Sequence, residues 1–559
     1  MDFKQEVIAT LQKHVKVDVA PLLTIPPDSK MGDYAFPCFT LGQNPKEAAE
    51  KLKEKITLPN TIAKAEVMGP YLNFFINPII LAESILTEIY RKQKTYGQQK
   101  YGKGTIAMDY SHPNIAKPFS VGHLRSTVIG NCLYKTLKTV GFEPLALNYL
   151  GDWGTQFGKL IVAFSKWGNK EDLKEEPIKY LLKLYVKFHE EAEKEDSLNQ
   201  QARDEFKKLE DGNPQSKELW DIFRELSLKE FNRIYDILGM TFDSYDGEAS
   251  INKQVQPAIE EIKEKVKTEM SDGALIVDLE EYNMPPMLLL KSDGATTYHS
   301  RDMATAFKRL RKLRAQKLLY IVGSEQKLHF KQLFKVLEMM GYPKENFIHA
   351  DFGLIRFPEG KMSTRKGRVI FLEDLLTKAI QTIEKIIEEK NPNLKNKKQV
   401  AEQVGVGAII FADLSNERTR NINFDWDRML SFDGETGPYI QYTHARACSI
   451  LRNAKAKHAI EPALHISFDV LHNNEEQALL KHLYSYPEVL QRVSDSYKPH
   501  HLAQYLIMLS QLFNEFYHAC PVLSDLSKQM KARVLLVDCV RQVLANGLDL
   551  MGIQAPGEM

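Results

Sequence analysis

Residues 111–127, SHPNIAKPFSVGHLRST, have the composition of a turn that holds phosphate at the start of a helix. Free backbone N–H groups at a helix start attract phosphate, and Gly122 leaves room for a ligand to approach the backbone. Ser120 could cap the helix, His123 could add a donor, and Lys117 brings a positive charge just outside. The simpler alternative is an ordinary strand-to-helix turn with a surface histidine.

A second turn of the same kind lies in residues 352–371, FGLIRFPEGKMSTRKGRVIF. A strand pattern ends here, Pro358 and Gly360 favour a turn, and a basic loop begins at Lys361. Such a loop can close over phosphates and neutralise charge that develops in a transition state. KMST alone would more often be a basic surface turn. Ligands of parallel α/β sheets bind at the carboxyl ends of the strands, however, and both turns fall there, so we expect them to face one ligand.

Strand and helix patterns alternate from residue 105 onward, and these elements would position the two turns. This alternation predicts a parallel sheet covered by helices over residues 105–380. The predicted strands cover residues 105–110, 144–151, 317–325 and 346–355. A stretch dense in Glu and Lys with helical apolar spacing predicts a helical insertion at about residues 169–240. The simplest role of this insertion is a solvated surface excursion.

The two ends of the chain differ from this middle part. Residues 1–104 mix helix-like and strand-like patterns, which predicts a compact α+β module. Residues 381–435 form a connecting helical region that contains a polar linker at 388–399. Residues 436–559 are wholly helical and predict an all-α bundle of about five helices. The chain is therefore expected to be a multidomain α/β protein.

The composition suits a globular protein with a large core, because 43% of the 559 residues are hydrophobic and 26% are charged. A net charge of +1 indicates no nucleic-acid partner by itself, although basic patches such as residues 308–317 could bind one. The five cysteines form no CxxC pair, which argues against a tightly bound metal and fits a reducing compartment. With no secretory signal and no membrane-spanning stretch, we expect a cytoplasmic protein.

The two turns resemble the two signatures of the class I aminoacyl-tRNA synthetases in the form used by arginyl-tRNA synthetases. The first signature is His-Ile-Gly-His, and Ser120 stands where its first His usually is. The second is Lys-Met-Ser-Lys-Ser, in which Lys361, Met362 and Ser363 match and Thr364 replaces the second Lys. Further strings that resemble this family cover residues 148–160, 291–304, 323–334 and 436–447.

The resemblance implies a Rossmann-like catalytic domain and a two-step reaction. ATP with Mg²⁺ activates L-arginine to arginyl-adenylate, and arginine then passes to the terminal adenosine of arginine tRNA. The expected ATP-binding residues are Ser120, Gly122, His123, Lys361, Met362 and Ser363. The expected catalytic residues, all of which handle phosphate, are Lys117, His123, Lys361 and Ser363. By the same resemblance, Lys117 compensates for the Lys that Thr364 replaces.

The resemblance also implies an arginine pocket made of Asn114, Glu248, Tyr298, Asp302 and Gln326. A guanidinium group is a planar fork of charged donors, so a pocket that selects it needs carboxylates in a fixed geometry. Tyr298 and Asp302 are four residues apart, which places them on one helix face. Asp302 and Glu248 would meet the cationic groups of the ligand, and which acid meets which nitrogen stays open. Taken alone, the Tyr298–Asp302 pair would more often lie on an exposed helix face.

Two outer regions would bind arginine tRNA if the family resemblance holds. Tyr71 and Asn73 match positions that contact the D-loop, where an aromatic face stacks and an amide reads a base edge. Tyr439 and Arg446, seven residues apart, would hold the anticodon, and Met559 could line the same site. The alternatives are an edge strand with incidental polar groups, and simple packing between helices.

Two other functions compete with arginine ligation. Ser120 and Thr364 keep open a tRNA-binding protein that no longer catalyses, against which His123, Lys361 and the pocket residues stand. A class I ligase for lysine, cysteine or glutamine is opposed by the NIAKP and GDWGTQFG strings. The family is mostly monomeric, so a monomer without a membrane partner is expected.

Overall fold

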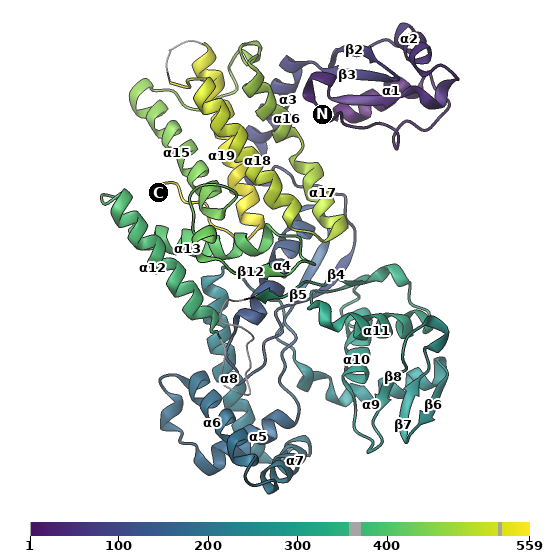
Figure 1. The fold of residues 1–559 in the computed structure, drawn as a ribbon, viewed down its shortest axis with the longest axis vertical. Coiled ribbons are helices and arrows are strands. Elements are labelled where there is room, and N and C mark those ends of the chain that lie inside the picture. Colours follow the sequence, from purple (N-terminus) through teal and green to yellow (C-terminus); the bar gives the residue numbers. More distant parts are fainter. Residues whose placement is uncertain (1, 357–369, 524–527) are drawn as a thin grey trace.

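The computed structural model describes residues 2–356, 370–523 and 528–559. The N-terminal residues form the α+β module that the sequence predicts (Figure 1). Its elements are α1 (Phe3–Gln12), β1 (Tyr34–Pro37), α2 (Pro45–Lys55), β2 (Ile62–Met68) and β3 (Tyr71–Ile76). The strands pair antiparallel in the order β1-β3-β2. The next helix, α3 (Pro78–Lys92), packs against the C-terminal bundle.

The middle of the chain contains a four-stranded parallel sheet in the order β10-β9-β4-β5. Its strands are β4 (Thr105–Asp109), β5 (Glu143–Leu147), β9 (Lys317–Tyr320) and β10 (Phe347–His349). β4 is buried along almost its whole length, as expected for an inner strand covered by helices on both faces. All four predicted strands are confirmed, and α4 (Val121–Thr139) and α11 (Lys327–Met339) connect neighbouring pairs of them.

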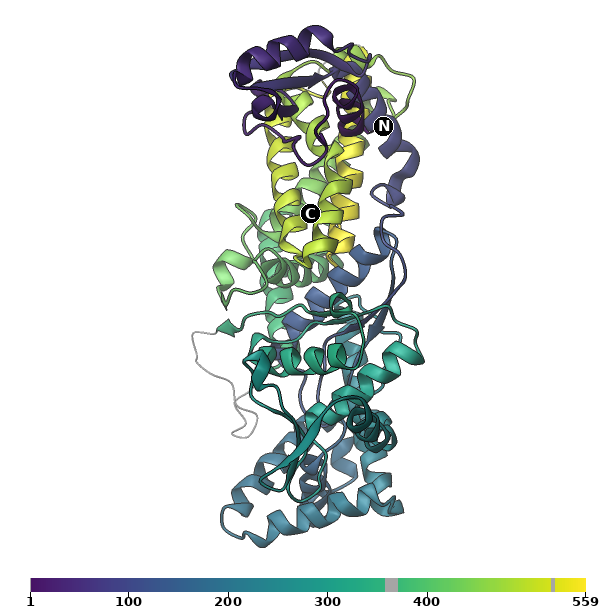
Figure 2. The same cartoon turned by 90° about the vertical axis from the view of Figure 1, so that its right-hand side faces the viewer.

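The predicted strand at residues 346–355 is divided in two. Its second part belongs to β11 (Ile355–Arg356), which leaves the main sheet and pairs with β12 (Ile422–Asn423). The predicted insertion is helical and forms one end of the elongated molecule (Figure 2). It consists of α6 (Pro177–Ala192), α7 (Ser197–Glu210) and α8 (Pro214–Ile237), packed against α5 (Thr155–Trp167).

A second insertion was not predicted from the sequence. It is a three-stranded antiparallel sheet of β6 (Thr268–Ser271), β7 (Ala274–Val277) and β8 (Met287–Leu290). The flanking helices are α9 (Asn252–Lys265) and α10 (Tyr298–Arg311), and their apolar faces share a core with it. Each strand has only four residues, too few for a clear alternating pattern. The Oγ1 atom of Thr297 donates to the carbonyl of Leu288 at 2.6 Å and joins this sheet to the start of α10.

Apart from the two-residue strand β12, the regular elements in the described residues of the last part of the chain are helices, as predicted. Its helices are α12 (Leu372–Lys390), α13 (Lys397–Leu414), α14 (Trp426–Met429), α15 (Gly437–His458), α16 (Asn474–Tyr484), α17 (Tyr486–Ser496), α18 (His500–Ala519) and α19 (Lys528–Leu550). The five predicted bundle helices correspond to α15–α19, and the expected linker shortens to residues 391–396 between α12 and α13.

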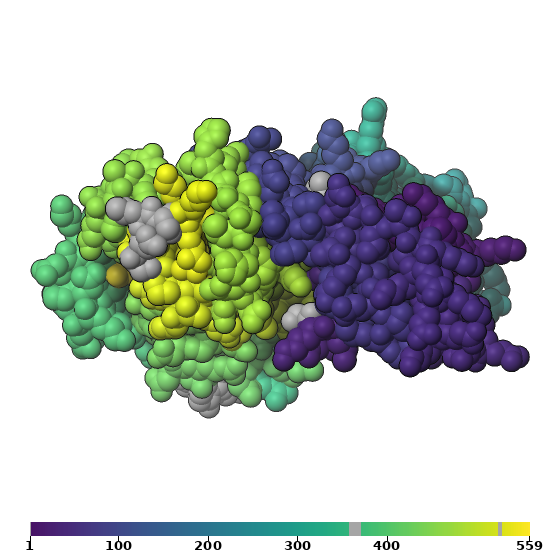
Figure 3. All heavy atoms as spheres, turned by 90° about the horizontal axis from the view of Figure 1, so that it is seen from above, coloured from purple at the N-terminus to yellow at the C-terminus, as the bar shows by residue number. Residues whose placement is uncertain are grey.

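The N-terminal module lies beside the bundle when the molecule is seen from above (Figure 3). The ammonium of Lys481 on α16 pairs with Asp33 at 2.6 Å, and the backbone N–H of Phe3 donates to the hydroxyl of Tyr484 at 3.2 Å. Across the described ranges, no helix has the length and apolar character needed to cross a membrane.

Candidate active site

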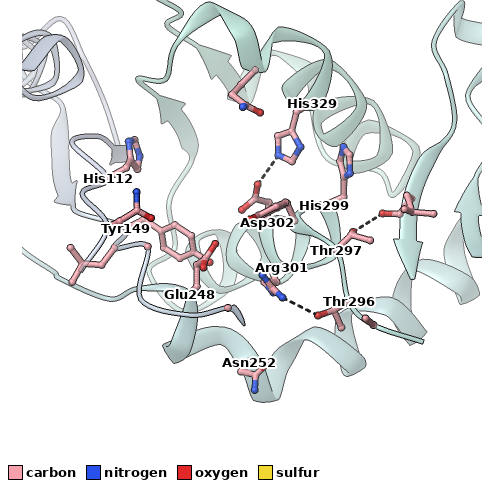
Figure 4. A pocket seen from close by; sticks show the side chains of 18 of the residues that line it. His112, Tyr149, Glu248, Asn252, Thr296, Thr297, His299, Arg301, Asp302 and His329 are labelled. Carbon is pink, nitrogen blue, oxygen red and sulfur yellow. Dashed lines mark hydrogen bonds and ion pairs between the residues drawn. The ribbon is translucent and has the colours of Figure 1, made fainter. Parts of the chain in front are cut away.

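A cavity of about 1140 Å³ opens at the carboxyl ends of β4 and β9. Its walls come from the turn after β4, from the segment after β5, from α10 and from the start of α11 (Figure 4). All five residues predicted for the arginine pocket line this one cavity, although they are spread over more than 200 positions of the sequence: Asn114, Glu248, Tyr298, Asp302 and Gln326. The fold therefore brings together the residues that the resemblance selected.

Asp302 lies on α10 and is held from the side by a histidine. The Nε2 atom of His329, on α11, is 2.6 Å from the Oδ2 atom of Asp302. The ring of His329 packs on that of His299 with 4.3 Å between centroids. Tyr298, at the first position of α10, is 69% exposed and shares the helix face of Asp302. Asp302 is thus fixed in place, whereas Tyr298 stands open at the rim.

Glu248 is a carboxyl group whose ionisation the cavity opposes. Its pKa is raised to about 7, mainly because the group is buried; the nearby Asp302 and Asp152 act in the same direction, and Arg301 acts in the opposite one. Its backbone N–H donates to the carbonyl of Leu150 at 3.1 Å. The carboxylate of Asp152 accepts from the next backbone N–H, at Ala249, at 2.8 Å. Glu248 is therefore anchored through its backbone, and its side chain lines the cavity together with Arg301 and Asp302.

The amide residues of the pocket lie at two different edges. A Cβ atom at Gly151 would stand 2.2 Å from the Oδ1 atom of Asn114, so only glycine leaves space for this amide. The backbone N–H of Ile115 donates to the carbonyl of Gly151 at 3.2 Å and fixes the two segments together. Gln326 ends the short helix η7 (Ser324–Gln326) after β9 and is exposed at the cavity edge.

The first signature turn begins a helix as predicted, with Ser120 at the N-cap of α4. The backbone N–H of Ser120 donates to the Nδ1 atom of His123 at 3.2 Å. The pKa of His123 is lowered to about 4, mainly because the ring is buried, and the neighbouring His112 and Lys117 act in the same direction. Gly122 is exposed at the same helix start. The ammonium of Lys117 donates to the Oε1 atom of Gln156 at 2.8 Å and lies 5.3 Å from the ring centre of Tyr185.

The second signature, with Lys361, Met362, Ser363 and Thr364, lies outside the described residues. The chain that follows it returns to the first signature. The backbone N–H of Val121 donates to the carbonyl of Ile370 at 3.2 Å, and the N–H of Leu372 donates to the carbonyl of Phe119 at 3.0 Å. The segment after the second turn is therefore bonded to the residues on either side of Ser120.

Comparison with known proteins agrees with this geometry. A family model for the catalytic domain of class I tRNA synthetases (R) matches residues 85–426. Models for the DALR anticodon binding domain and the arginyl tRNA synthetase N terminal domain match residues 440–559 and 1–76. This chain belongs to the arginyl-tRNA synthetases of class I.

The similarity to individual members covers the whole chain. This chain is 45% identical to an arginine–tRNA ligase of Clostridioides difficile and 44% identical to one of Halothermothrix orenii, and each comparison covers all of both chains. Among solved structures, the arginyl-tRNA synthetase of Thermus thermophilus matches with a TM-score of 0.85 at 26% identity, covering 100% of this chain and 99% of that one. The Rossmann-like fold predicted for the catalytic domain is confirmed.

Several cavity residues were not singled out from the sequence: Asp109, His112, Tyr149, Arg301 and His329. His112 lies inside the first signature string, and His329 follows Gln326 by three residues on one helical stretch. Both carried a usable signal, because each shares a turn or a helix face with a predicted residue. Tyr149 and Arg301 also lie inside strings that resemble the family, at residues 148–160 and 291–304, but their place beside Glu248 depends on how three segments meet.

The residues predicted to contact the D-loop lie on β3 with different exposures. Tyr71 is 36% exposed, and its ring meets that of the exposed Phe39 edge-on at 5.6 Å. Asn73 is only 3% exposed, and its Nδ2 atom donates to the carbonyl of Met31 at 2.6 Å. In this conformation Tyr71 faces solvent, whereas the amide of Asn73 serves the module itself.

The residues predicted to contact the anticodon meet at one side chain of α18. The Nδ2 atom of Asn514 donates to the hydroxyl of Tyr439 at 2.8 Å, and its Oδ1 atom accepts from Arg446 at 2.7 Å. The guanidinium of Arg446 also lies 4.9 Å from the ring centre of Tyr442. The carbonyl of Met559 accepts from the side chain of Asn391 at 3.2 Å. Tyr439 and Arg446 are thus held together on one surface.

Proposed function

We propose that this chain is an arginine–tRNA ligase that activates L-arginine with ATP and transfers it to the terminal adenosine of arginine tRNA. The observation that carries this proposal is the convergence of Asn114, Glu248, Tyr298, Asp302 and Gln326 on one cavity. Two carboxyl groups, Asp302 and Glu248, face the same space, which suits a ligand with a guanidinium and an amino group. The two amides would orient that ligand.

The activation step requires positioning and charge neutralisation rather than a protein nucleophile. An oxygen of the arginine carboxylate attacks the α-phosphorus of ATP, the bond to the bridging oxygen breaks, and pyrophosphate leaves. We assign the phosphates to the start of α4, with Ser120, Gly122 and His123, and to Lys361, Met362 and Ser363 of the second signature. Because Nδ1 of His123 accepts a backbone N–H, its proton is assigned to Nε2, where a neutral ring can donate to a phosphate oxygen.

Magnesium enters this proposal as part of the ATP substrate. Mg²⁺ prefers phosphate and water oxygens together with one or two carboxylates. Residues 2–356, 370–523 and 528–559 contain no group of three or more histidine, cysteine, aspartate or glutamate side chains placed to hold a metal ion. The ATP phosphates would therefore carry the ion into the site.

We assign to Lys117 the charge that Thr364 does not supply. Its ammonium is held by Gln156 at the first turn of α5, beside the start of α4. We expect Lys117→Ala to lower arginine-dependent ATP–pyrophosphate exchange by well over threefold. A loss below about threefold, under ~1 kcal/mol, would refute the assignment. Lys166→Ala, an exposed lysine at the end of α5, is the matched control.

Arginine-dependent ATP–pyrophosphate exchange, measured with and without arginine tRNA, tests the function as a whole. We expect exchange with arginine and tRNA present, and none with lysine in place of arginine. No exchange with cognate tRNA would favour a tRNA-binding protein without catalysis. Activity with lysine alone would contradict the specificity.

The outer surfaces belong to the same proposal. We assign Tyr71 and Asn73 to the D-loop, and Tyr439, Arg446 and Met559 to the anticodon. We further propose that the enzyme acts as a cytoplasmic monomer, so sedimentation at micromolar concentration should give the mass of one chain. A dimer under these conditions would contradict that part of the proposal.

A further inference from the structure

His112 is a histidine of the first signature turn whose placement the reaction, as described so far, does not use. It lines the cavity that holds the predicted arginine residues, and its side chain is 24% exposed (Figure 4). The same turn lacks an imidazole at Ser120, where the signature usually has its first histidine. One histidine is thus absent from the turn, and another faces the cavity eight positions earlier.

The ring of His112 is fixed by a buried carboxylate at the end of β4. Its Nε2 atom lies 2.8 Å from the Oδ1 atom of Asp109, and the guanidinium of Arg309 lies 2.7 Å from the Oδ2 atom. Burial opposes ionisation of Asp109, but Arg309 and His112 outweigh it and keep its pKa below the usual value. Asp109 is therefore a carboxylate that accepts from Nε2. Within the described part of the chain, the Nδ1 atom of His112 has no hydrogen-bond partner and is left for a ligand.

The backbone that carries His112 is strained. Ser111 and His112 have φ values of 80° and 55°, a left-handed conformation that costs a residue with a side chain about 1 kcal/mol or more. Such a conformation persists only where its surroundings enforce it.

Buried hydroxyl groups supply that enforcement. The backbone N–H of Ser111 donates to the Oγ atom of Ser126 at 2.9 Å, and Ser126 donates to the carbonyl of Ile321 at 2.6 Å. The Oγ atom of Ser111 is 2.7 Å from the hydroxyl of Tyr235 and 2.9 Å from that of Thr127. Three segments thus hold this strained turn in place, and the turn directs the imidazole of His112 into the cavity.

The position of His112 relates it to the ATP end of the site as well as to the arginine end. It is close enough to His123, at the start of α4, to lower the pKa of that histidine. It also precedes the pocket residue Asn114 by two positions. His112 is therefore near His123 of the group assigned to phosphate and near Asn114 of the group assigned to arginine, so we place it where the arginine carboxylate would meet the α-phosphate.

We propose that His112 is a catalytic residue that binds the α-phosphate of ATP and replaces the imidazole that Ser120 removes from the first signature. This inference rests on the proposed adenylation reaction. A doubly protonated ring between the carboxylate of Asp109 and a phosphate oxygen would donate to both, through Nε2 and Nδ1. Its donation to the phosphate strengthens as negative charge grows in the transition state.

The kinetics of ATP–pyrophosphate exchange in two variants test this role of His112. His112→Ala removes the ring, and His112→Asn keeps a donor for Asp109. We expect both to lower kcat/KM for ATP by about 100-fold, the typical effect of one transition-state donor. The affinity for arginine without ATP, measured by calorimetry, should change less than twofold. Unchanged exchange, or a loss confined to arginine binding, would overturn the proposal. His465→Ala, an exposed surface histidine, is the control.

Moving the histidine from position 112 to position 120 gives a second, independent test. Adding Ser120→His to His112→Ala should recover at least tenfold of the lost kcat/KM for ATP, which a purely structural role of His112 would not allow. Absence of recovery in a double variant that binds arginine normally would contradict the proposal. If the double variant does not bind arginine, His112→Asn alone decides. Wild-type protein without any exchange activity would refute the proposed function instead, so the two failures are distinguishable.

Discussion

The arginine cavity and the two tRNA surfaces were predicted from one resemblance, yet they are built in different ways. In the cavity, Asp302 and Glu248 are anchored by His329 and by the backbone around Asp152, and both face open space. On the outer surfaces, Asn73 bonds Met31, and Tyr439 and Arg446 share Asn514. The site proposed for arginine is thus formed in advance, whereas the groups assigned to RNA are engaged with the protein itself.

The difference follows from the ligands. A buried guanidinium needs acceptors in a fixed geometry, because any unpaired charge in the cavity is costly. RNA bases that splay out of a loop bind mainly by stacking on exposed faces, which tolerates side chains that also bond their neighbours. Residue substitutions should therefore act sharply and on one ligand in the cavity, and more gradually on the outer surfaces.

The largest effect is expected from Asp302→Ala. Truncating one partner of a buried charge pair costs 2–5 kcal/mol, so arginine affinity should fall by about 100-fold or more. Affinity for ATP should change less than threefold, because Asp302 lies at the arginine end of the cavity. Equilibrium binding of each substrate measures both. Glu325→Ala, beside Gln326 but outside the cavity lining, is the control. Equal losses for ATP and arginine would remove the distinction between the two ends.

The same comparison explains which parts of the site the sequence could predict. Thr297 begins α10, and the four-residue spacing then fixes Tyr298 and Asp302 on one face. This arrangement is local, and the sequence contained it. The contact of His329 with Asp302 joins two helices, and the short β6–β7–β8 sheet depends on packing against α9 and α10. The burial of Asn73 likewise depends on Met31, 42 residues away. Such contacts have no local sequence pattern. A family resemblance predicts which residue belongs to the site, but it does not predict which side chains contact that residue.

Tyr71→Ala should have the next largest effect, on tRNA alone. Stacking of one base on an aromatic ring contributes about 1–3 kcal/mol, so the KM for arginine tRNA should rise by about 30-fold with exchange kinetics for arginine unchanged. Tyr71→Phe keeps the ring and should stay within twofold of the wild type. Asn73→Ala should also lower the stability of the N-terminal module by about 1 kcal/mol, since it removes the bond to Met31. If the Tyr71→Ala variant aminoacylates arginine tRNA normally, β3 does not contact the tRNA.

A pH dependence of arginine binding should come from Glu248. Its pKa is raised to about 7 in the empty cavity, and arginine, a cation, binds the carboxylate form. Affinity should therefore increase as the pH rises through this value, by about tenfold between pH 6 and pH 8. Calorimetry without ATP measures it, and proton release on binding should be visible in buffers of different ionisation enthalpy. Glu248→Gln should bind weakly with a flat profile. A slope that persists in this variant would assign the titration to a group other than Glu248.

The smallest effect is expected where the outer surface is most engaged with the protein. Asn514 bonds both Tyr439 and Arg446, and the guanidinium of Arg446 also lies 4.9 Å from the ring centre of Tyr442. If it positions them for a base, Asn514→Ala should weaken arginine tRNA binding by about fivefold, the loss of roughly 1 kcal/mol of hydrogen bonding. Gln504→Ala, exposed on the same helix, should have no effect. Tighter binding by Asn514→Ala would mean that the contact competes with RNA. The anticodon surface would then differ from the cavity in kind, because it would have to open before its ligand could bind.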